Sequence, residues 1–540
     1  MMGSAQRPLL IPNLDGLTPL PLRKRPSYLL RIAVLLSVLV VVVITLTRDE
    51  PKQAASLSLQ RLKSLPSRPW ASAATTNLAV QSCEVCHLDP TNPLCEYGEH
   101  NIRLSRAFEG SGYRLQRFMR KVLAGEEVQI GVLGASVTQG HSVPFGNPIW
   151  HEVWFKDFQE RYPNSKMHVG AVGATDSEFF SYCFPALLPV EDIDLFLVEL
   201  DVNNDPGLKT LKDDDALMRG LLQQPKEPAI IRISFFATIF HEQGRGTLST
   251  LITSQFFDIP VISVRNFMLP EVIKHRDSAE IIFGLDYRGQ RDYRHVSELS
   301  HRVMANMLTL FVRKETCELK RQDLLPAKTT HEMSGPWWKE EDLGTVPDIT
   351  LYESWLKPKP RRVVTPLCHS TVIPRSPLIP VSRDDAFVLT EWNGKSAWIS
   401  NEPGSQIRLR FVGSKVGLFL YSMAAPGKSA VAAHMAKVTK GKEPPKEEEE
   451  GPGMAVCWVE EPGEHERELA DIKAGRKVKP KNRIEWVVDS HDPRKPAAGT
   501  EFTELADDLE PGVEHILACE VSKETTSGGH KWRLQAIASL

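Results

Sequence analysis

Three polar residues in two distant segments have the side chains that nucleophilic acyl transfer requires. Ser136 follows the apolar residues 128–133 in the segment Gly-Val-Leu-Gly-Ala-Ser-Val-Thr-Gln-Gly, where a strand should pass into a loop. A serine at that point can present its hydroxyl beside free backbone N–H groups. Asp292 precedes His295 by three residues, so its carboxylate can orient one imidazole nitrogen and leave the other for a serine hydroxyl. Each segment alone is ambiguous, because a Gly/Ser turn or polar residues before a helix are commonly structural.

Two further blocks lie between these segments and complete a pattern of four. Gly173 stands in the segment His-Val-Gly-Ala-Val-Gly-Ala-Thr, and Asn203 follows Val-Glu-Leu-Asp-Val. Together with the Gly-Ala-Ser block that ends at Ser136 and the Asp-x-x-His block that ends at His295, they occur in the order found in the SGNH (GDSL-type) hydrolases. The chain therefore resembles this family, and in style it is close to fungal surface-polysaccharide-associated members.

The resemblance implies a serine-hydrolase mechanism. Ser136 would be the nucleophile, His295 the general base and acid, and Asp292 the group that orients the imidazole. The backbone N–H groups of Ser136 and Gly173, with the side chain of Asn203, would form the oxyanion hole, in which one donor contributes about 10²–10³ in kcat. The mechanism needs neither a metal ion nor a cofactor.

The sequence departs from the family pattern at several positions. Ala135 replaces the usual Asp, which is not a catalytic group in the family, and His168 stands where the second block often has Asn. The third block offers three candidates for the oxyanion hole, Asn203, Asn204 and Asp205. Ungapped alignment on Val-Glu-Leu favours Asn203.

Short apolar strands that alternate with longer amphipathic segments would position these residues. Apolar strands separated by helices indicate a parallel sheet covered on both faces, and the resemblance implies a three-layer α/β/α flavodoxin-like domain. The predicted strands are Val128–Leu133, Met167–Val172, Ile193–Leu200, Ala229–Phe235 and Pro260–Val264.

The C-terminal region has a different period. Apolar and charged residues alternate at 407–411, and several further short β-type segments are separated by Gly/Pro turns, which is typical of an antiparallel β-sandwich. The region resembles the jelly-roll modules that accompany carbohydrate esterases. Some of its tryptophans could stack on sugar rings and others could be core residues; they are Trp392, Trp398, Trp458, Trp486 and Trp532.

An apolar segment near the N-terminus is long enough to cross a bilayer. Residues 28–47 contain a single charge, Arg31, and follow the basic residues 23–25, so the N-terminus is predicted to be cytoplasmic and the rest lumenal or extracellular. A cleaved signal peptide is the alternative. The predicted parts are a cytoplasmic tail, a transmembrane helix, a lumenal stem with a cysteine cluster, the hydrolase domain, a linker and the β-sandwich, at 1–27, 28–47, 48–100, 101–320, 321–380 and 381–540.

All eight cysteines follow the apolar segment, which suits an oxidising compartment such as the Golgi or another part of the secretory pathway. Cys83, Cys86 and His87 match a c-type haem pattern, but disulfides are the favoured interpretation of this cluster. A disulfide between Cys457 and Cys519 is a further hypothesis. The net charge of −3 gives no indication of a nucleic-acid partner.

These expectations favour a type II membrane-anchored esterase that hydrolyses a small acyl ester, such as O-acetyl, on a glycan. Two alternatives stay open. A glycan O-acetyltransferase would use the same triad with a different acyl acceptor, and a non-catalytic glycan-binding scaffold would keep only the fold. The sequence gives no oligomeric state.

Overall fold

The computed structural model describes residues 82–540 with gaps at 241–244, 246, 325–339, 357–365, 393, 425–449, 461–466, 468–469, 471–473, 475–482 and 494–498. The predicted cytoplasmic tail, the predicted transmembrane helix and residues 48–81 of the predicted stem lie outside the described residues. Within the described part of the chain, no helix has both the length and the apolar character needed to cross a membrane.

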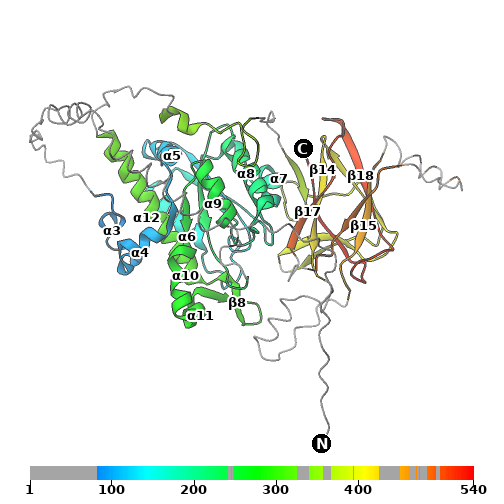
Figure 1. Ribbon diagram of the computed structural model, residues 1–540, viewed down its shortest axis with the longest axis horizontal. Helices are drawn as coiled ribbons and strands as arrows, with labels where there is room; N and C mark the ends of the chain where they lie inside the picture. The colour runs from blue at the N-terminus through cyan, green and yellow to red at the C-terminus, as the bar shows by residue number, and fades with distance from the viewer. Residues whose placement is uncertain are drawn as a thin grey trace, which may run out of the picture. The chain divides into compact units, whose positions relative to one another are not determined.

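A mixed sheet of six strands forms the centre of the first domain (Figure 1). Its five parallel strands run in the order β3-β2-β4-β5-β6, which is the order of flavodoxin-like doubly wound sheets. The predicted parallel sheet is therefore confirmed, and β1 adds an antiparallel strand at one edge. The strands are β1 (Arg106–Phe108), β2 (Val128–Gly134), β3 (Ser165–Ala171), β4 (Leu195–Glu199), β5 (Ala229–Ser234) and β6 (Val261–Ser263).

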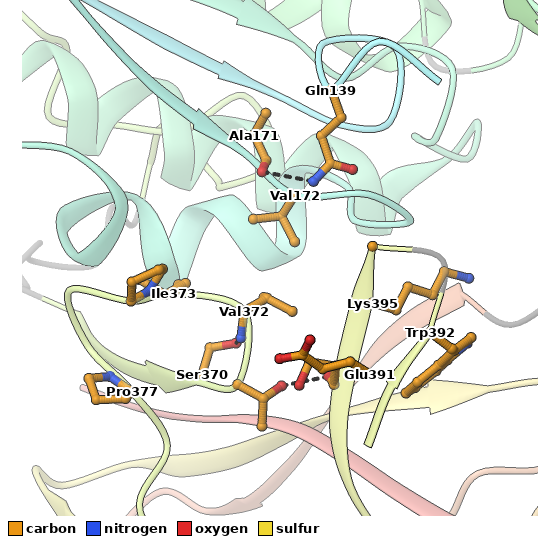
Figure 2. A pocket seen from close by; sticks show the side chains of 14 residues that line it. Gln139, Ala171, Val172, Ser370, Val372, Ile373, Pro377, Glu391, Trp392 and Lys395 are labelled. Atoms are coloured by element: carbon orange, nitrogen blue, oxygen red, sulfur yellow. Dashed lines mark hydrogen bonds between the residues drawn. The ribbon is translucent and has the colours of Figure 1, made fainter. Parts of the chain in front are cut away.

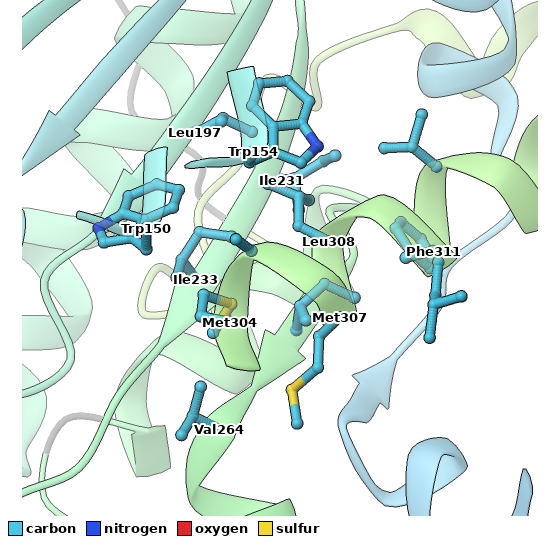
Figure 3. Close-up of a cluster of buried hydrophobic side chains, with 14 of the residues drawn as sticks. Trp150, Trp154, Leu197, Ile231, Ile233, Val264, Met304, Met307, Leu308 and Phe311 are labelled. Atoms are coloured by element: carbon cyan, nitrogen blue, oxygen red, sulfur yellow. The ribbon is translucent and has the colours of Figure 1, made fainter. Parts of the chain in front are cut away.

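Helices cover both faces of this sheet and bury a separate core on each. On one face, α6 and α12 pack their tryptophan, methionine and leucine side chains on Leu197, Ile231 and Ile233 (Figure 3). On the other face, α7 and α8 enclose the second core with Phe196 and Val198. The helices are α5 (Tyr113–Leu123), α6 (Trp150–Arg161), α7 (Ser177–Leu187), α8 (Leu208–Leu222), α9 (Thr247–Phe256), α10 (Val264–Lys274), α11 (Ala279–Ile282) and α12 (Glu298–Asp323).

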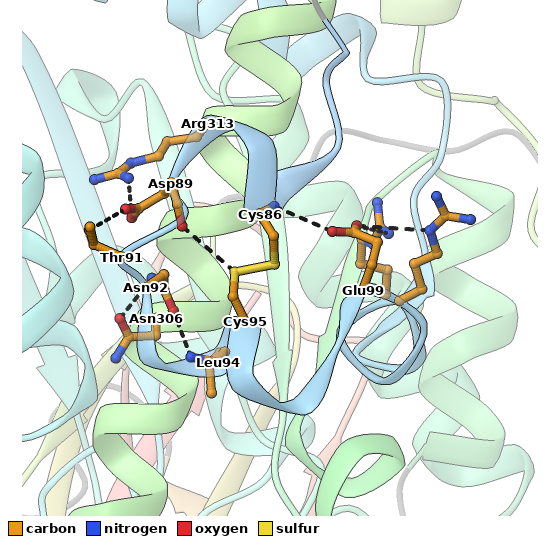
Figure 4. The surroundings of a disulfide bond; sticks show 11 residues. Cys86, Asp89, Thr91, Asn92, Leu94, Cys95, Glu99, Asn306 and Arg313 are labelled. Atoms are coloured by element: carbon orange, nitrogen blue, oxygen red, sulfur yellow. Dashed lines mark hydrogen bonds and ion pairs between the residues drawn. A yellow bond between two sulfur atoms is a disulfide. The ribbon is translucent and has the colours of Figure 1, made fainter.

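The cysteine cluster belongs to the folded domain, which corrects the predicted extent of the stem. A disulfide joins Cys86 to Cys95 (Figure 4). A second disulfide joins Cys83 to Cys317 of α12, so the disulfide interpretation of the cluster is confirmed. The side chains of the short helices α3 (Val85–Leu88), η1 (Pro93–Tyr97) and α4 (Glu99–Leu104) enter the first core. Residues 83–100 were assigned to the stem, but burial of their apolar side chains holds them on the α/β domain.

Two antiparallel sheets form the C-terminal domain and enclose one core, as predicted for a β-sandwich. The hypothesis of a disulfide between Cys457 and Cys519, which face each other on β15 and β18, is confirmed. One sheet contains β10 (Ser382–Arg383), β13 (Gln406–Val412), β18 (Glu514–Val521), β15 (Met454–Glu460) and β16 (Trp486–Asp489). The other contains β11 (Val388–Trp392), β12 (Lys395–Ser400), β19 (Trp532–Ser539), β14 (Val416–Ser422) and β17 (Gly499–Ala506), with β9 (Leu367–Ser370) paired to β19.

The sandwich is joined to the α/β domain by a covalent bond and by an apolar contact. Cys183 of α7 forms a disulfide with Cys368 of β9, within the segment predicted to be a linker. The Tyr182 ring of α7 stacks on Phe502 with a centroid distance of 4.6 Å, and Phe419 lies beside both rings. Helix α7 covers the outer face of the sheet that contains β14 and β19, so every residue of these two strands is buried.

Candidate active site

The turn that carries Ser136 is fixed between β2 and β4. The Ala135 amide donates to the carbonyl oxygen of Glu199, and the Thr138 hydroxyl donates to the Glu199 carboxyl at 2.8 Å. A Cβ atom at Gly134 would lie 2.1 Å from the Thr138 hydroxyl oxygen, so only glycine fits there. The sequence forms this tight turn because small residues let its backbone close on the strand end. Ser136 itself is buried at the carboxyl end of β2.

Ser136, His295 and Asp292 form a continuous chain of hydrogen bonds. The Ser136 Oγ lies 2.7 Å from Nε2 of His295, and Nδ1 of His295 lies 2.6 Å from Oδ2 of Asp292. The acid and base stand on β8 (Arg291–Val296), which pairs with β7 (Phe283–Leu285) in a small ribbon. The structure thus brings together all three residues predicted for the triad, from segments more than 150 residues apart in the sequence.

Four donors surround the Asp292 carboxylate. Besides His295, the Ser142 hydroxyl donates to Oδ2 at 2.7 Å, and the backbone amides of Arg294 and His295 donate to Oδ1 at 3.0 and 3.3 Å. Burial alone would raise the pKa of Asp292, but the hydrogen bonds from His295 and Ser142 hold that pKa well below its usual range. The carboxylate is therefore ionised and can stabilise a positively charged imidazole. Ser142 was not predicted, because nothing in its sequence context distinguishes it from a loop serine.

The first predicted oxyanion-hole residue, Gly173, lies against the nucleophile turn. A Cβ atom at Gly173 would be 2.6 Å from the Gln139 side-chain oxygen and 3.6 Å from the His141 ring. A side chain at this position would require the Gln139 side chain to move. Gly173 follows β3 directly after Val172, whose amide donates to the carbonyl oxygen of Gly134.

The three candidates of the third block have different surroundings. Asn204 is buried, and its amide group exchanges hydrogen bonds of 2.8 and 2.9 Å with Ser177. Asp205 forms an ion pair with Arg245. Asn203 is only half-buried, and its Nδ2 donates one hydrogen bond of 2.7 Å to the Thr175 carbonyl oxygen. Because an amide NH₂ group carries two hydrogens, Asn203 can donate a second hydrogen bond.

A second histidine lies beside the triad. The ring of His141 meets that of His295 edge-on, with a centroid distance of 5.2 Å. Burial, followed by the charge of His295 and then that of Lys395, lowers the pKa of His141 to about 4. His141 is therefore neutral at physiological pH and does not oppose the protonation of His295.

The acidic residues near the strand ends have structural partners. Arg232 of β5 donates two hydrogen bonds to Asp214 at 2.8 and 2.9 Å, and both side chains are fully buried. Asp201 accepts a hydrogen bond of 2.9 Å from Thr250. Over the described residues, no three His, Cys, Asp or Glu side chains are grouped so that they could hold a metal ion.

Comparisons with solved structures found esterases and GDSL-type lipases. A two-domain esterase active on acetylated mannans is 17% identical, with a TM-score of 0.49 over 81% of this chain and 98% of the esterase. A putative GDSL-like lipase from Parabacteroides merdae is 13% identical (TM-score 0.28; 36% of this chain and 96% of the lipase). An acetyl xylan esterase is 15% identical (TM-score 0.27; 34% of this chain and 98% of the esterase). No protein-family model and no curated protein sequence matches the chain.

The chemical argument for this chain rests on the geometry of its own triad.

Proposed function

We propose that this protein is a serine esterase and that Ser136, His295 and Asp292 are its catalytic residues. The observation that carries this proposal is the unbroken path of hydrogen bonds, 2.7 and 2.6 Å long, from the serine hydroxyl to an ionised carboxylate. A serine hydroxyl is a weak nucleophile on its own, and this path gives it a base that is held in the correct tautomer.

The reaction would proceed in two steps. Ser136 attacks the ester carbonyl while His295 takes its proton, and the oxyanion accepts hydrogen bonds from the amides of Ser136 and Gly173 and from Asn203. Collapse of this intermediate breaks the ester bond, and the alcohol leaves with the proton from His295. A water molecule, activated by the same histidine, then attacks the acyl-serine, releases the acid and restores Ser136.

We propose a small acyl ester on a glycan, such as an O-acetyl group, as the substrate. A β-sandwich fixed beside the α/β domain suits a polymeric substrate that extends beyond the ester. Acetylated mannan and acetylated xylan, the substrates of two structural neighbours, are the first polysaccharides to test.

We also propose that the protein acts on the lumenal or extracellular side of a membrane in the secretory pathway, anchored by residues 28–47. All eight cysteines are paired in four disulfides, a state that an oxidising compartment maintains. Protease protection of the C-terminal part in sealed microsomes, lost on addition of detergent, would test this topology.

A fluorophosphonate probe tests the esterase proposal directly. The wild type and Ser278→Ala, a control serine on the surface of η3 (Arg276–Ser278), should react, and Ser136→Ala should not. Release of acetate from the two polysaccharides should fall by at least about 10³-fold in Ser136→Ala. A wild type that neither reacts nor releases acetate would favour the glycan-binding scaffold, and an acetylated glycan product would favour the transferase.

A further inference from the structure

A cavity of about 500 Å³ lies between the nucleophile turn and the β-sandwich. The α/β domain lines it with Gln139, Ala171 and Val172, and the sandwich lines it with residues 370–374 and 377 and with residues 391–396 except Asn393. Figure 2 shows Glu391 and Lys395 on the sandwich side, across from Gln139 and Val172. Its volume falls within the range of about 300–1,000 Å³ that is typical of ligand sites.

The cavity adjoins the oxyanion side of Ser136. Ala171 and Val172 directly precede Gly173, and Gln139 belongs to the turn that begins at Ser136. The Gln139 amide donates to the Ala171 carbonyl oxygen at 3.2 Å, so this wall connects the ends of β2 and β3. A molecule in the cavity would therefore lie next to the group that binds the ester carbonyl.

The tip of the β11–β12 hairpin reaches the histidines of the site. Gly394 has a φ of +73°, and a Cβ atom there would lie 4.0 Å from Nε2 of His141. Lys395 is close enough for its charge to add to the effect of burial and of His295 in lowering the pKa of His141. Since the His141 ring also contacts His295, a single side chain, that of His141, lies between the tip of the hairpin and the triad.

The hairpin offers side chains of the kinds that bind sugars. Trp392 is half-buried, and its ring meets Tyr421 edge-on with a centroid distance of 5.2 Å, which fixes the indole. The Lys395 ammonium lies 5.6 Å from the centre of the same Tyr421 ring, and Glu391 is exposed. An aromatic face can pack on the apolar face of a sugar ring, and a carboxylate or an ammonium can bind hydroxyl groups.

The hairpin is also held in place. The Cys183–Cys368 disulfide fixes Cys368, which lies two residues before Ser370 in the cavity wall. The hydroxyl of the next residue, Thr371, donates to the Ser396 carbonyl oxygen of β12. The rings of Tyr182 and Phe502 stack at the same junction. The cavity is therefore preorganised, which lowers the cost of binding a ligand.

We propose that the β11–β12 hairpin forms the glycan-binding wall of the active site. Trp392 packs against a sugar ring of the chain that carries the ester, and Lys395, its cross-strand neighbour on the same face of the hairpin, binds the hydroxyl groups of that sugar. This inference rests on the proposed esterase function. It identifies the residues that bind the sugar part of the substrate, whereas the triad acts only on the ester. The sandwich would then be part of the catalytic site itself.

Two substrates of different size test the wall. Trp392→Ala and Lys395→Ala should lower kcat/KM on acetylated mannan or acetylated xylan by about tenfold or more, mainly through KM. The same variants should lose much less activity on p-nitrophenyl acetate than on the polysaccharide, because this small ester has no sugar chain to contact the hairpin. Leu389→Ala is the matched control, an exposed residue of β11 outside the cavity, and should leave both substrates unaffected.

A binding measurement separates this inference from the esterase proposal. Ser136→Ala should bind mannopentaose or xylopentaose in calorimetry, and Ser136→Ala with Trp392→Ala should bind the same sugar at least about tenfold more weakly. If sugar binding depends on Trp392 but the wild type releases no acid from either polysaccharide, only the esterase proposal is overturned. Three results would overturn the proposal of a glycan-binding wall. Trp392→Ala could show the same polysaccharide kinetics as Leu389→Ala, it could lose as much activity on p-nitrophenyl acetate as on the polysaccharide, or Ser136→Ala could bind neither sugar.

Discussion

Glu199 places a buried carboxyl group directly beneath the nucleophile turn. It ends β4, is fully buried, and accepts the Thr138 hydroxyl on one oxygen, while its other oxygen has no hydrogen-bond partner among the described residues. Burial raises the pKa of Glu199 from 4.5 to about 8; the nearby Asp201 adds to this effect, and the hydrogen bond from Thr138 opposes it. The carboxyl group is therefore mostly neutral at pH 7.

The sign of the effect on stability follows from the raised pKa. The folded state holds the proton more tightly than the unfolded state, so stability is highest below pH 4.5 and is lost as the pH rises towards 8. At about 1.36 kcal/mol for each unit of pKa, the loss between pH 5 and pH 8 is about 3.5 kcal/mol. Glu199→Gln keeps the shape and an acceptor for Thr138 and removes the ionisation, so it should remove this loss.

Urea unfolding at pH 5 and pH 8, with the disulfides intact, measures the difference. The free energy of unfolding of Glu199→Gln relative to the wild type should increase by about 3.5 kcal/mol from pH 5 to pH 8. Esterase activity at pH 7 should be retained, because a neutral group replaces a neutral group. Glu191→Gln, an exposed residue before the same strand, is the control. If the stability difference between Glu199→Gln and the wild type does not change with pH, the buried neutral carboxyl is refuted.

Three further substitutions have consequences that the structure determines. Asp292→Asn should lower kcat on the order of 10⁴-fold with little change in fold, since an amide favours the wrong tautomer of the histidine; measured acetate release near wild-type rates would contradict the triad. Replacing Cys457 and Cys519 by alanine opens a loop of 62 residues and should lower the free energy of unfolding by about 2–4 kcal/mol, which urea titration measures. Asp214→Ala removes the carboxylate that pairs with the buried Arg232 charge and should lower the free energy of unfolding by about 3–5 kcal/mol. Calorimetric melting measures this loss, and an unchanged transition would contradict it.

The parallel sheet could be predicted because its strands are short, apolar and separated by helices. Every residue of β4 is buried, so the segment reads as a continuous apolar strand up to Glu199. The residues of the triad could be predicted for a different reason. The segments of Ser136 and of Asp292 with His295 are each ambiguous alone, but with the Gly173 and Asn203 blocks between them they occur in the order found in the SGNH hydrolases.

The remaining features depend on contacts between distant segments. Eight cysteines allow 105 pairings, and the bond from Cys183 to Cys368 follows only from the packing of α7 on β9. Asn203 and Asn204 are neighbouring asparagines, yet only Asn204 forms hydrogen bonds with Ser177 in the interior. Local patterns carry no information about either contact, because both partners come from other elements.

The nucleophile turn does more than present Ser136. Its first residue contacts the base of the triad, and Ser142, six residues later, contacts the acid. These two hydrogen bonds connect β8 to the turn that follows β2. The positions of Asp292 and His295 therefore do not depend on the short β7–β8 ribbon alone. Since His141 from the same turn also meets the hairpin of the sandwich, one loop coordinates the nucleophile, its acid–base partners and the proposed glycan-binding wall. The arrangement explains why the triad residues can come from distant segments and still keep hydrogen-bond distances.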